Sequence, residues 1–315
     1  MMDYSKATQK FRLHSQNIPL EDDYEGMVSA KVDFYEVEGA QTAVVYLHGY
    51  MDYFFQNHLA DFFIDKGISF YALELRKYGS SIQKHQHKNF CKDIREYYEE
   101  LSFVLKKAKA KGHDKIILHG HSTGGLIATH YLLYAQDKEL VSAAVLNSPF
   151  FAFNTSETLK KVLSLVTPLG KFLPYLPFTR LPSLYTESLH KDYRGRWDFN
   201  LTYKPIPSFV SYLGWMRAIF NAQQEIHKGS IEKIPALILH SDSSYFNSSW
   251  SEEAAHADAV LNVEDIDSYA KKIYKDVSVV SVEGALHDIV LSTDPVIDRY
   301  FSEISQWLDQ NVQRF

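Results

Sequence analysis

The chain of 315 residues contains one cysteine, Cys91, and therefore forms no internal disulfide. This is compatible with a reducing compartment. Long hydrophobic runs are also missing. Residues 1–20 lack the apolar centre of a signal peptide, and no apolar run approaches the roughly 18 residues that span a bilayer. These absences predict a cytoplasmic protein without stable membrane insertion.

An excess of positive charge is missing too, because 33 basic residues face 39 acidic ones, a net charge of −6. Phosphate binding needs a clustered basic surface, so we expect no nucleic-acid partner. Hydrophobic residues make up 45% of the chain and charged residues 23%. These values are ordinary for a soluble globular protein and exclude disordered, collagen-like and disulfide-scaffold classes. The length allows one large domain or two ordinary ones.

Short apolar runs alternate with segments of helical period. Continuous apolar runs are typical of strands that are covered on both faces, as in a mostly parallel sheet. The predicted strands are 28–37, 42–47, 68–75, 115–118, 142–146, 236–239 and 277–282. Two clear helices are predicted, over residues 89–111 and from Asp294 onward. The alternation predicts an α/β fold.

Residues 150–230 break this alternation, since they are rich in aromatic residues, leucine and proline and show no clear strand. A structureless loop of that length is uncommon in a compact domain. We therefore predict a mainly helical cap over residues 150–230, inserted into a core of residues 1–149 and 231–315. One apolar stripe of the cap is expected to roof a pocket, or alternatively to face lipid at an entrance. Its members are Leu159, Val162, Leu163, Val166 and Leu169.

The strongest chemical signal is Gly-His-Ser-Thr-Gly-Gly at residues 120–125, between a predicted strand and a run of helical period. A serine at such a junction has a cramped backbone, so glycines are needed two residues to either side. The turn aims the hydroxyl into open space. Because a serine hydroxyl needs a neighbouring base to become a nucleophile, we look for a base elsewhere in the chain. The alternative is an ordinary turn with an N-capping serine.

This motif and its flanks resemble the α/β-hydrolase superfamily, in particular the capped branch of monoacylglycerol lipases and lysophospholipase-like esterases. The resemblance covers nearly the whole chain. It implies a mostly parallel central sheet flanked by helices, with Ser122 as the nucleophile of an ester hydrolase that works through an acyl-enzyme intermediate. No cofactor and no metal are implied.

Two loops after predicted strands extend the resemblance. His-Gly-Tyr-Met at residues 48–51 matches the loop that supplies an oxyanion-hole N–H in the family, which implies Tyr50 and Thr123 as the backbone donors. Residues 74–81 resemble the family's Asp-x-Arg-Gly-x-Gly-x-Ser loop, with Glu74 in place of Asp and Lys77 in place of the first glycine. We interpret this second loop as architecture.

The resemblance implies His287, in the loop after the last predicted strand, as the general base. Two residues, Asp258 and Asp242, are candidates for the acid that would orient this histidine. Asp258 begins a segment similar to the family's Asp followed by apolar residues, but this match requires a 15-residue insertion at 243–257. The alternative acid, Asp242, lies closer to its predicted strand, two positions before the expected place. Either one can instead be an ordinary surface or turn-capping residue.

Other motifs give weaker indications of function. His85 and His87 have strand-pair spacing, but no further ligand follows at metal spacing, so we expect a solvated loop. No phosphate loop or dinucleotide motif is present. The predicted partner is a small-molecule ester, first an acylglycerol or lysophospholipid and next a short-chain or aromatic ester. A peptidase or acyltransferase on the same scaffold, and a non-catalytic ligand-binding relative, stay as alternatives.

Overall fold

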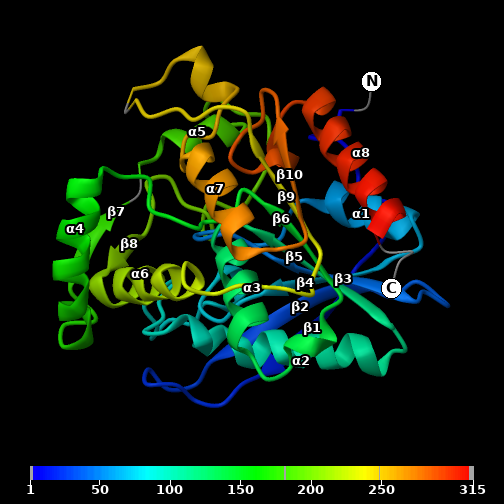
Figure 1. Cartoon of the computed structure of the whole chain (residues 1–315), viewed down its shortest axis with the longest axis horizontal. Helices are drawn as coiled ribbons and strands as arrows, with labels where there is room; N and C mark the ends of the chain where they lie inside the picture. Colours follow the sequence, from blue (N-terminus) through cyan, green and yellow to red (C-terminus); the bar gives the residue numbers. More distant parts are fainter. Residues whose placement is uncertain (1–2, 181, 248, 312–315) are drawn as a thin grey trace.

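An eight-stranded sheet forms the centre of the structure, a computed structural model that describes residues 3–180, 182–247 and 249–311 (Figure 1). The strand order is β1-β2-β4-β3-β5-β6-β9-β10. β1 and β2 are antiparallel to their neighbours, and the other strands run parallel. The strands are β1 His14–Pro19, β2 Ser29–Tyr35, β3 Thr42–Leu47, β4 Ser69–Glu74, β5 Lys115–His121, β6 Ala143–Asn147, β9 Ala236–Ser241 and β10 Val277–Val282. The predicted mostly parallel α/β sheet is confirmed.

The central strands β3, β4, β5, β6 and β9 are buried on both faces, which explains their continuous apolar runs. In β3, Val45 and Leu47 point into one core, and Val44 and Tyr46 point into the other. The first core is covered by α2 (Tyr98–Ala110), α3 (Thr123–Tyr134) and α7 (Val263–Ile273). The second is covered by α1 (Asn57–Asp65) and α8 (Asp294–Asn311), which Figure 1 shows together at one end of the sheet.

Two elements at the start of the chain differ from the sequence-based expectation. β1 was not predicted because its side chains are mostly polar and exposed, so it has no apolar period. The predicted helix over residues 89–111 begins later, with a 3-10 turn at Ile94–Tyr97 followed by α2. A capping box sets this start: the Asp93 carboxylate accepts from the Arg95 N–H, and the Glu96 carboxylate accepts from the Asp93 N–H.

The chain leaves the sheet after β6 and returns at β9. We call residues 150–230 between them the inserted segment; the predicted boundaries between core and cap stay a prediction. The segment contains α4 (Glu157–Val166), α5 (Leu184–Leu189) and α6 (Leu213–Ile226). It also contains a two-stranded antiparallel sheet of β7 (Pro177–Arg180) and β8 (Val210–Tyr212), which was not predicted because both strands are very short. Figure 1 shows α4, β7, β8 and α6 gathered at one end of the molecule.

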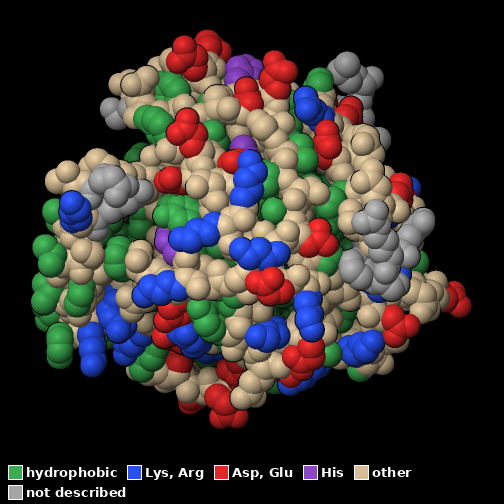
Figure 2. All heavy atoms as spheres, viewed as in Figure 1, with side chains coloured by type: hydrophobic (Ala, Val, Ile, Leu, Met, Phe, Trp, Pro, Cys, Tyr) green, Lys and Arg blue, Asp and Glu red, His purple; other side chains and the backbone are tan. Residues whose placement is uncertain are grey.

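The apolar stripe of the inserted segment is divided between interior and surface. Leu163 is buried and Val166 is half-buried, whereas Val162 and Leu169 are 45% and 51% exposed. The side chain of Leu159 lies outside the described residues. Val162 and Leu169 are therefore accessible from outside the core, and whether they roof a pocket or face lipid stays a prediction. Figure 2 shows apolar side chains gathered over α4 and β7 at this edge.

A second part of the inserted segment is fastened firmly to the core. The indole N–H of Trp197 donates to the carbonyl of Leu291 at 2.6 Å, and its ring stacks on His58 of α1 with centroids 5.0 Å apart. Arg196 pairs with Asp294 at the start of α8, at 2.6 Å. Within the described ranges of the chain, the structure has no helix with the length and apolarity that a membrane crossing requires.

The contact between His58 and Trp197 makes stability depend on pH. Burial lowers the pKa of His58 to about 4, although its ring donates to the carbonyl of Val290. Between about pH 6.5 and 4 the unfolded chain binds a proton at this residue and the folded chain does not, so stability falls on acidification. We expect His58→Gln to reduce the slope of unfolding free energy against pH in this window by about 1.4 kcal/mol per pH unit. Urea titrations at several pH values test this, and parallel curves for the two proteins would contradict it.

Candidate active site

Ser122 occupies the junction between β5 and α3. Its backbone has φ 52° and ψ −116°, a conformation that residues other than glycine rarely adopt. The surrounding backbone leaves no room for larger residues. A Cβ added at Gly120 would lie 2.7 Å from the carbonyl oxygen of Gly124, and one added at Gly124 would lie 2.4 Å from that of Leu47. Such strain persists only where the neighbouring structure enforces it, and it is typical of functional sites.

His287 lies between Ser122 and Asp258. Its Nε2 is 2.9 Å from Ser122 Oγ, and its Nδ1 is 2.8 Å from Asp258 Oδ2. With the proton on Nδ1, the imidazole donates to the carboxylate and accepts from the hydroxyl. All three residues are nearly buried, at 8% exposure for Ser122, 3% for His287 and 0% for Asp258. The structure thus brings together a potential nucleophile, base and acid from three distant parts of the chain.

Asp258, rather than Asp242, contacts His287. The second oxygen of Asp258, Oδ1, accepts from the backbone N–H groups of Val260 and Leu261, both at 2.8 Å. The chain leaves β9, makes an excursion over residues 243–257 and returns through a bridge between Ser244 and Asp258. Asp242 is exposed, and its Oδ1 accepts from the Gly284 N–H at 2.9 Å.

The loop after β3 passes directly beside Ser122. A Cβ added at Gly49 would lie 3.2 Å from Ser122 Cβ, a tight contact that glycine avoids. His48 holds the loop, since its Nδ1 donates to the Gly49 carbonyl at 2.8 Å and its Nε2 accepts from the Leu75 N–H at 3.1 Å. Burial lowers the pKa of His48, which keeps the ring neutral as this pair of hydrogen bonds requires. The predicted donor Tyr50 follows Gly49.

Thr123, the other predicted donor, is the first residue of α3. The first N–H groups of a helix have no intrahelical acceptor, so this N–H is available to a developing negative charge next to Ser122. The helix N-terminus adds a favourable dipole at the same place. Tyr50 and Thr123 thus stand on the two chain segments that flank the serine.

The loop at residues 74–81 is held by a network of polar contacts, which is consistent with a structural role. Glu74 Oε1 accepts from Ser80 Oγ at 2.6 Å and from the Ser81 N–H at 3.0 Å. Lys77 has φ 63°, the left-handed conformation that favours glycine, which explains why a glycine suits this position in the resembling family. Its fully buried ammonium lies 2.6 Å from both Asp23 and Glu25. The loop is therefore held by hydrogen bonds and buried ion pairs of its own.

A buried polar cluster next to the candidate site was not predicted. Asp288 accepts from the side-chain amides of Asn147 at 2.7 Å and Gln56 at 3.0 Å. Burial raises the pKa of Asp288, but the electrostatic interactions with His121 and with the ammonium of Lys204 and the Gln56 hydrogen bond outweigh it, so the pKa is lowered. Asp52 pairs with Lys204, whose Nζ is 3.0 Å from Asp52 Oδ1.

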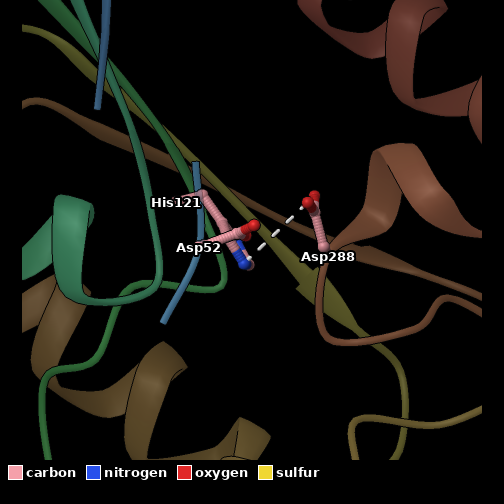
Figure 3. Close-up of side chains that lie close together, drawn as sticks. All are labelled: Asp52, His121 and Asp288. Carbon is pink, nitrogen blue, oxygen red and sulfur yellow. Dashed lines mark ion pairs between the residues drawn. The ribbon is translucent and has the colours of Figure 1, made fainter. Parts of the chain in front are cut away.

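Asp52, His121 and Asp288 point toward one another, with potential ligand atoms within 4.8 Å (Figure 3). Their partners do not fit a resident cation, because the ammonium of Lys204 already lies against Asp52 and two amides donate to Asp288. We therefore assign no metal here. In the pair of histidines noted in the sequence, His85 is exposed, while the His87 ring stacks on that of Tyr175 with centroids 4.5 Å apart.

This chain can now be compared with known proteins. A family model described as Hydrolase_4, serine aminopeptidase S33, matches residues 38–294, most of the chain. The chain belongs to this hydrolase family. A comparison with curated protein sequences gives no match.

Several solved structures share the hydrolase's fold at low sequence identity. A soluble variant of monoglyceride lipase from Saccharomyces cerevisiae, in complex with a substrate analog, is 20% identical with a TM-score of 0.74, and 99% of each chain is covered. Monoacylglycerol lipase from Paleococcus ferrophilus is 17% identical with a TM-score of 0.63, covering 96% of this chain and 100% of that one. The α/β hydrolase GrgF from Penicillium sp. sh18 is 16% identical with a TM-score of 0.60, covering 94% and 97%. The predicted α/β-hydrolase fold is confirmed.

The close approach at Gly124 gives a stability prediction for the hydrolase. In Gly124→Ala the added Cβ meets the backbone carbonyls of Leu47 and His48, which belong to the sheet and its loop. We expect a loss of about 3 kcal/mol in the free energy of unfolding. In the matched control Gly229→Ala the Cβ meets only Leu133 methyl groups, and we expect a loss of about 1 kcal/mol or less. Equal losses in urea unfolding would contradict this explanation.

Proposed function

We propose that this chain is a serine hydrolase that cleaves carboxylic esters through an acyl-enzyme intermediate. The observation that carries the proposal is the hydrogen-bonded series from Ser122 through His287 to Asp258, built on a strained strand–helix turn. The chain order Ser, Asp, His agrees with the order in α/β-hydrolases. The near burial of all three residues strengthens their electrostatic interactions, because little water screens them.

In the proposed reaction, Ser122 Oγ attacks the ester carbonyl carbon while His287 Nε2 takes the hydroxyl proton. The carbonyl oxygen becomes negative and is stabilised by the N–H groups of Tyr50 and Thr123, each worth about 10²–10³ in rate. His287 then gives its proton to the leaving alcohol, and Ser122 keeps the acyl group. A water molecule, deprotonated by His287, then attacks the acyl carbon; the bond to Ser122 Oγ breaks, His287 returns the proton to that oxygen, and the carboxylic acid leaves. Asp258 orients the imidazole and stabilises its charged form.

We propose acylglycerols or lysophospholipids as the substrate class. Esters with long acyl chains occur in water mainly as aggregates, and an enzyme that uses them benefits from an apolar surface. The inserted segment exposes such side chains on α4 and the turn after it, among them Leu165 at 78% and Phe172 at 76%. The fold similarity to two monoacylglycerol-type lipases supports the same class.

An amide hydrolase is the second candidate, because the matching family model is described as a serine aminopeptidase. The same three residues serve both reactions, and the difference lies in the leaving group and its surroundings. The proposed assignment of a catalytic Ser122 speaks against the third possibility, a relative that only binds ligands.

An active-site label tests the proposal. We expect a fluorophosphonate probe to react with Ser122, located by peptide mass spectrometry, and Ser122→Ala to stay unlabelled. Labelling of another residue, or none in the folded wild-type protein, would overturn the catalytic proposal.

The acid is tested by a pair of matched substitutions. We expect Asp258→Asn to lower kcat by about 10³–10⁴, because the imidazole loses its orientation and its charge partner. Asp242→Asn should leave kcat within about threefold of wild type, since its carboxylate accepts from the Gly284 N–H and does not contact His287. Steady-state kinetics on one p-nitrophenyl ester gives both values. A large loss with Asp242→Asn alone would transfer the role of the acid to that residue.

A substrate panel tests the proposed class. The panel contains p-nitrophenyl esters of graded acyl length, a monoacylglycerol, a lysophospholipid and an aminoacyl p-nitroanilide. We expect kcat/KM to rise with acyl length and the anilide to react more slowly than every ester, since the amine is the poorer leaving group. Preference for the anilide would favour the aminopeptidase candidate instead.

A further inference from the structure

The loop that carries Tyr50 is held from the side opposite to the sheet by the inserted segment. The Tyr50 ring stacks on Trp215 of α6, with centroids 3.9 Å apart and an interplanar angle of 27°. Its hydroxyl lies 3.1 Å from the Ser211 hydroxyl in β8. The side chain of a predicted oxyanion donor is therefore in contact with two elements outside the core sheet.

Two residues further on, Asp52 forms a buried ion pair with the same segment. Lys204 Nζ lies 3.0 Å from Asp52 Oδ1, and the two side chains are 6% and 2% exposed. The same carboxylate oxygen accepts the Tyr53 N–H at 3.0 Å, which fixes Asp52 within its own loop. The ammonium is also enclosed by aromatic rings, with Phe55 and Phe199 centroids 5.4 and 5.5 Å away.

Lys204 comes from a short turn that is itself immobilised. Its backbone N–H donates to the Asn200 carbonyl at 3.0 Å, and the Asn200 N–H donates to the Tyr53 hydroxyl at 2.6 Å. A few residues earlier, Trp197 and Arg196 fasten the chain to the core near α8. The cation is therefore presented to Asp52 from a fixed support rather than from a freely moving arm.

We propose that Lys204 is a positioning residue, which holds the oxyanion loop so that the Tyr50 N–H meets the developing negative charge. The inference rests on the proposed function and deepens it. Oxyanion donors must be placed within about 0.5 Å to be effective. Because the charge appears only in the transition state, a displaced donor lowers kcat and leaves substrate binding nearly unchanged.

The experiment compares Lys204→Met, which keeps an unbranched side chain of nearly the same length and removes the charge, with wild type on a p-nitrophenyl ester. We expect kcat to fall about 10–100-fold, less than the loss of a whole donor, with KM within about threefold. Lys204→Arg should recover most of the loss. The matched control is Lys191→Met, an exposed lysine of the same segment that pairs with Asp198 at 2.6 Å, and it should retain wild-type kcat.

A double variant separates positioning from simple charge compensation. Lys204→Met leaves Asp52 buried without its counterion, which destabilises the fold. Asp52→Asn with Lys204→Met removes that penalty, so we expect thermal stability to return while kcat stays low. If the double variant regains wild-type kcat, Lys204 only neutralises Asp52 and the inference fails. Unchanged kcat in Lys204→Met would also overturn it. Absence of fluorophosphonate labelling in the wild-type protein would instead overturn the proposed function.

Discussion

The backbone conformation of Ser122 is the constraint on which the rest of the site depends. Its positive φ is accommodated where backbone segments approach closer than a side chain allows at Gly120 and Gly124, and where the loop at Gly49 packs tightly against it. This close approach places the loop that contains Tyr50 next to the serine and the N-terminus of α3 beneath it. The proposed donors and the nucleophile are thus fixed by one packing arrangement, and hydrogen bonding to His287 follows from it.

The parallel sheet explains how distant residues meet. The carboxyl ends of β3, β5, β9 and β10 lie at one edge, and the loops that follow them carry Tyr50, Ser122, Asp258 and His287. The inserted segment reaches this edge through Tyr185, whose ring lies 5.4 Å from that of His287 and whose hydroxyl accepts from the Asp288 N–H at 3.0 Å. Burial also governs the neighbouring charges. Burial lowers the pKa of His121, while the ammonium of Lys204 and the Gln56 amide help to lower the pKa of Asp288.

Much of this was predictable from the sequence, because strands buried on both faces leave continuous apolar runs and a serine turn leaves glycines. The contact between Asp258 and His287 was harder to predict, since an insertion separates Asp258 from its strand and spacing alone cannot distinguish it from Asp242. The ion pair of Asp52 and Lys204 could not be predicted from the sequence, because the two residues lie far apart in loops and no periodic pattern connects them. Helical spacing identified the stripe around Leu163 but not its burial, because the period of a helix does not specify which neighbour covers it.

The central claim is that the Ser122 hydroxyl accepts an acyl group with the help of His287. Rapid-quench mass spectrometry after mixing with p-nitrophenyl octanoate tests this most directly, because it detects the covalent intermediate itself. The account predicts a burst of p-nitrophenol and an octanoyl group on the peptide that contains Ser122, with accumulation slowed strongly in His287→Ala. Turnover that persists in Ser122→Ala, or an acyl group found on another residue, would contradict it.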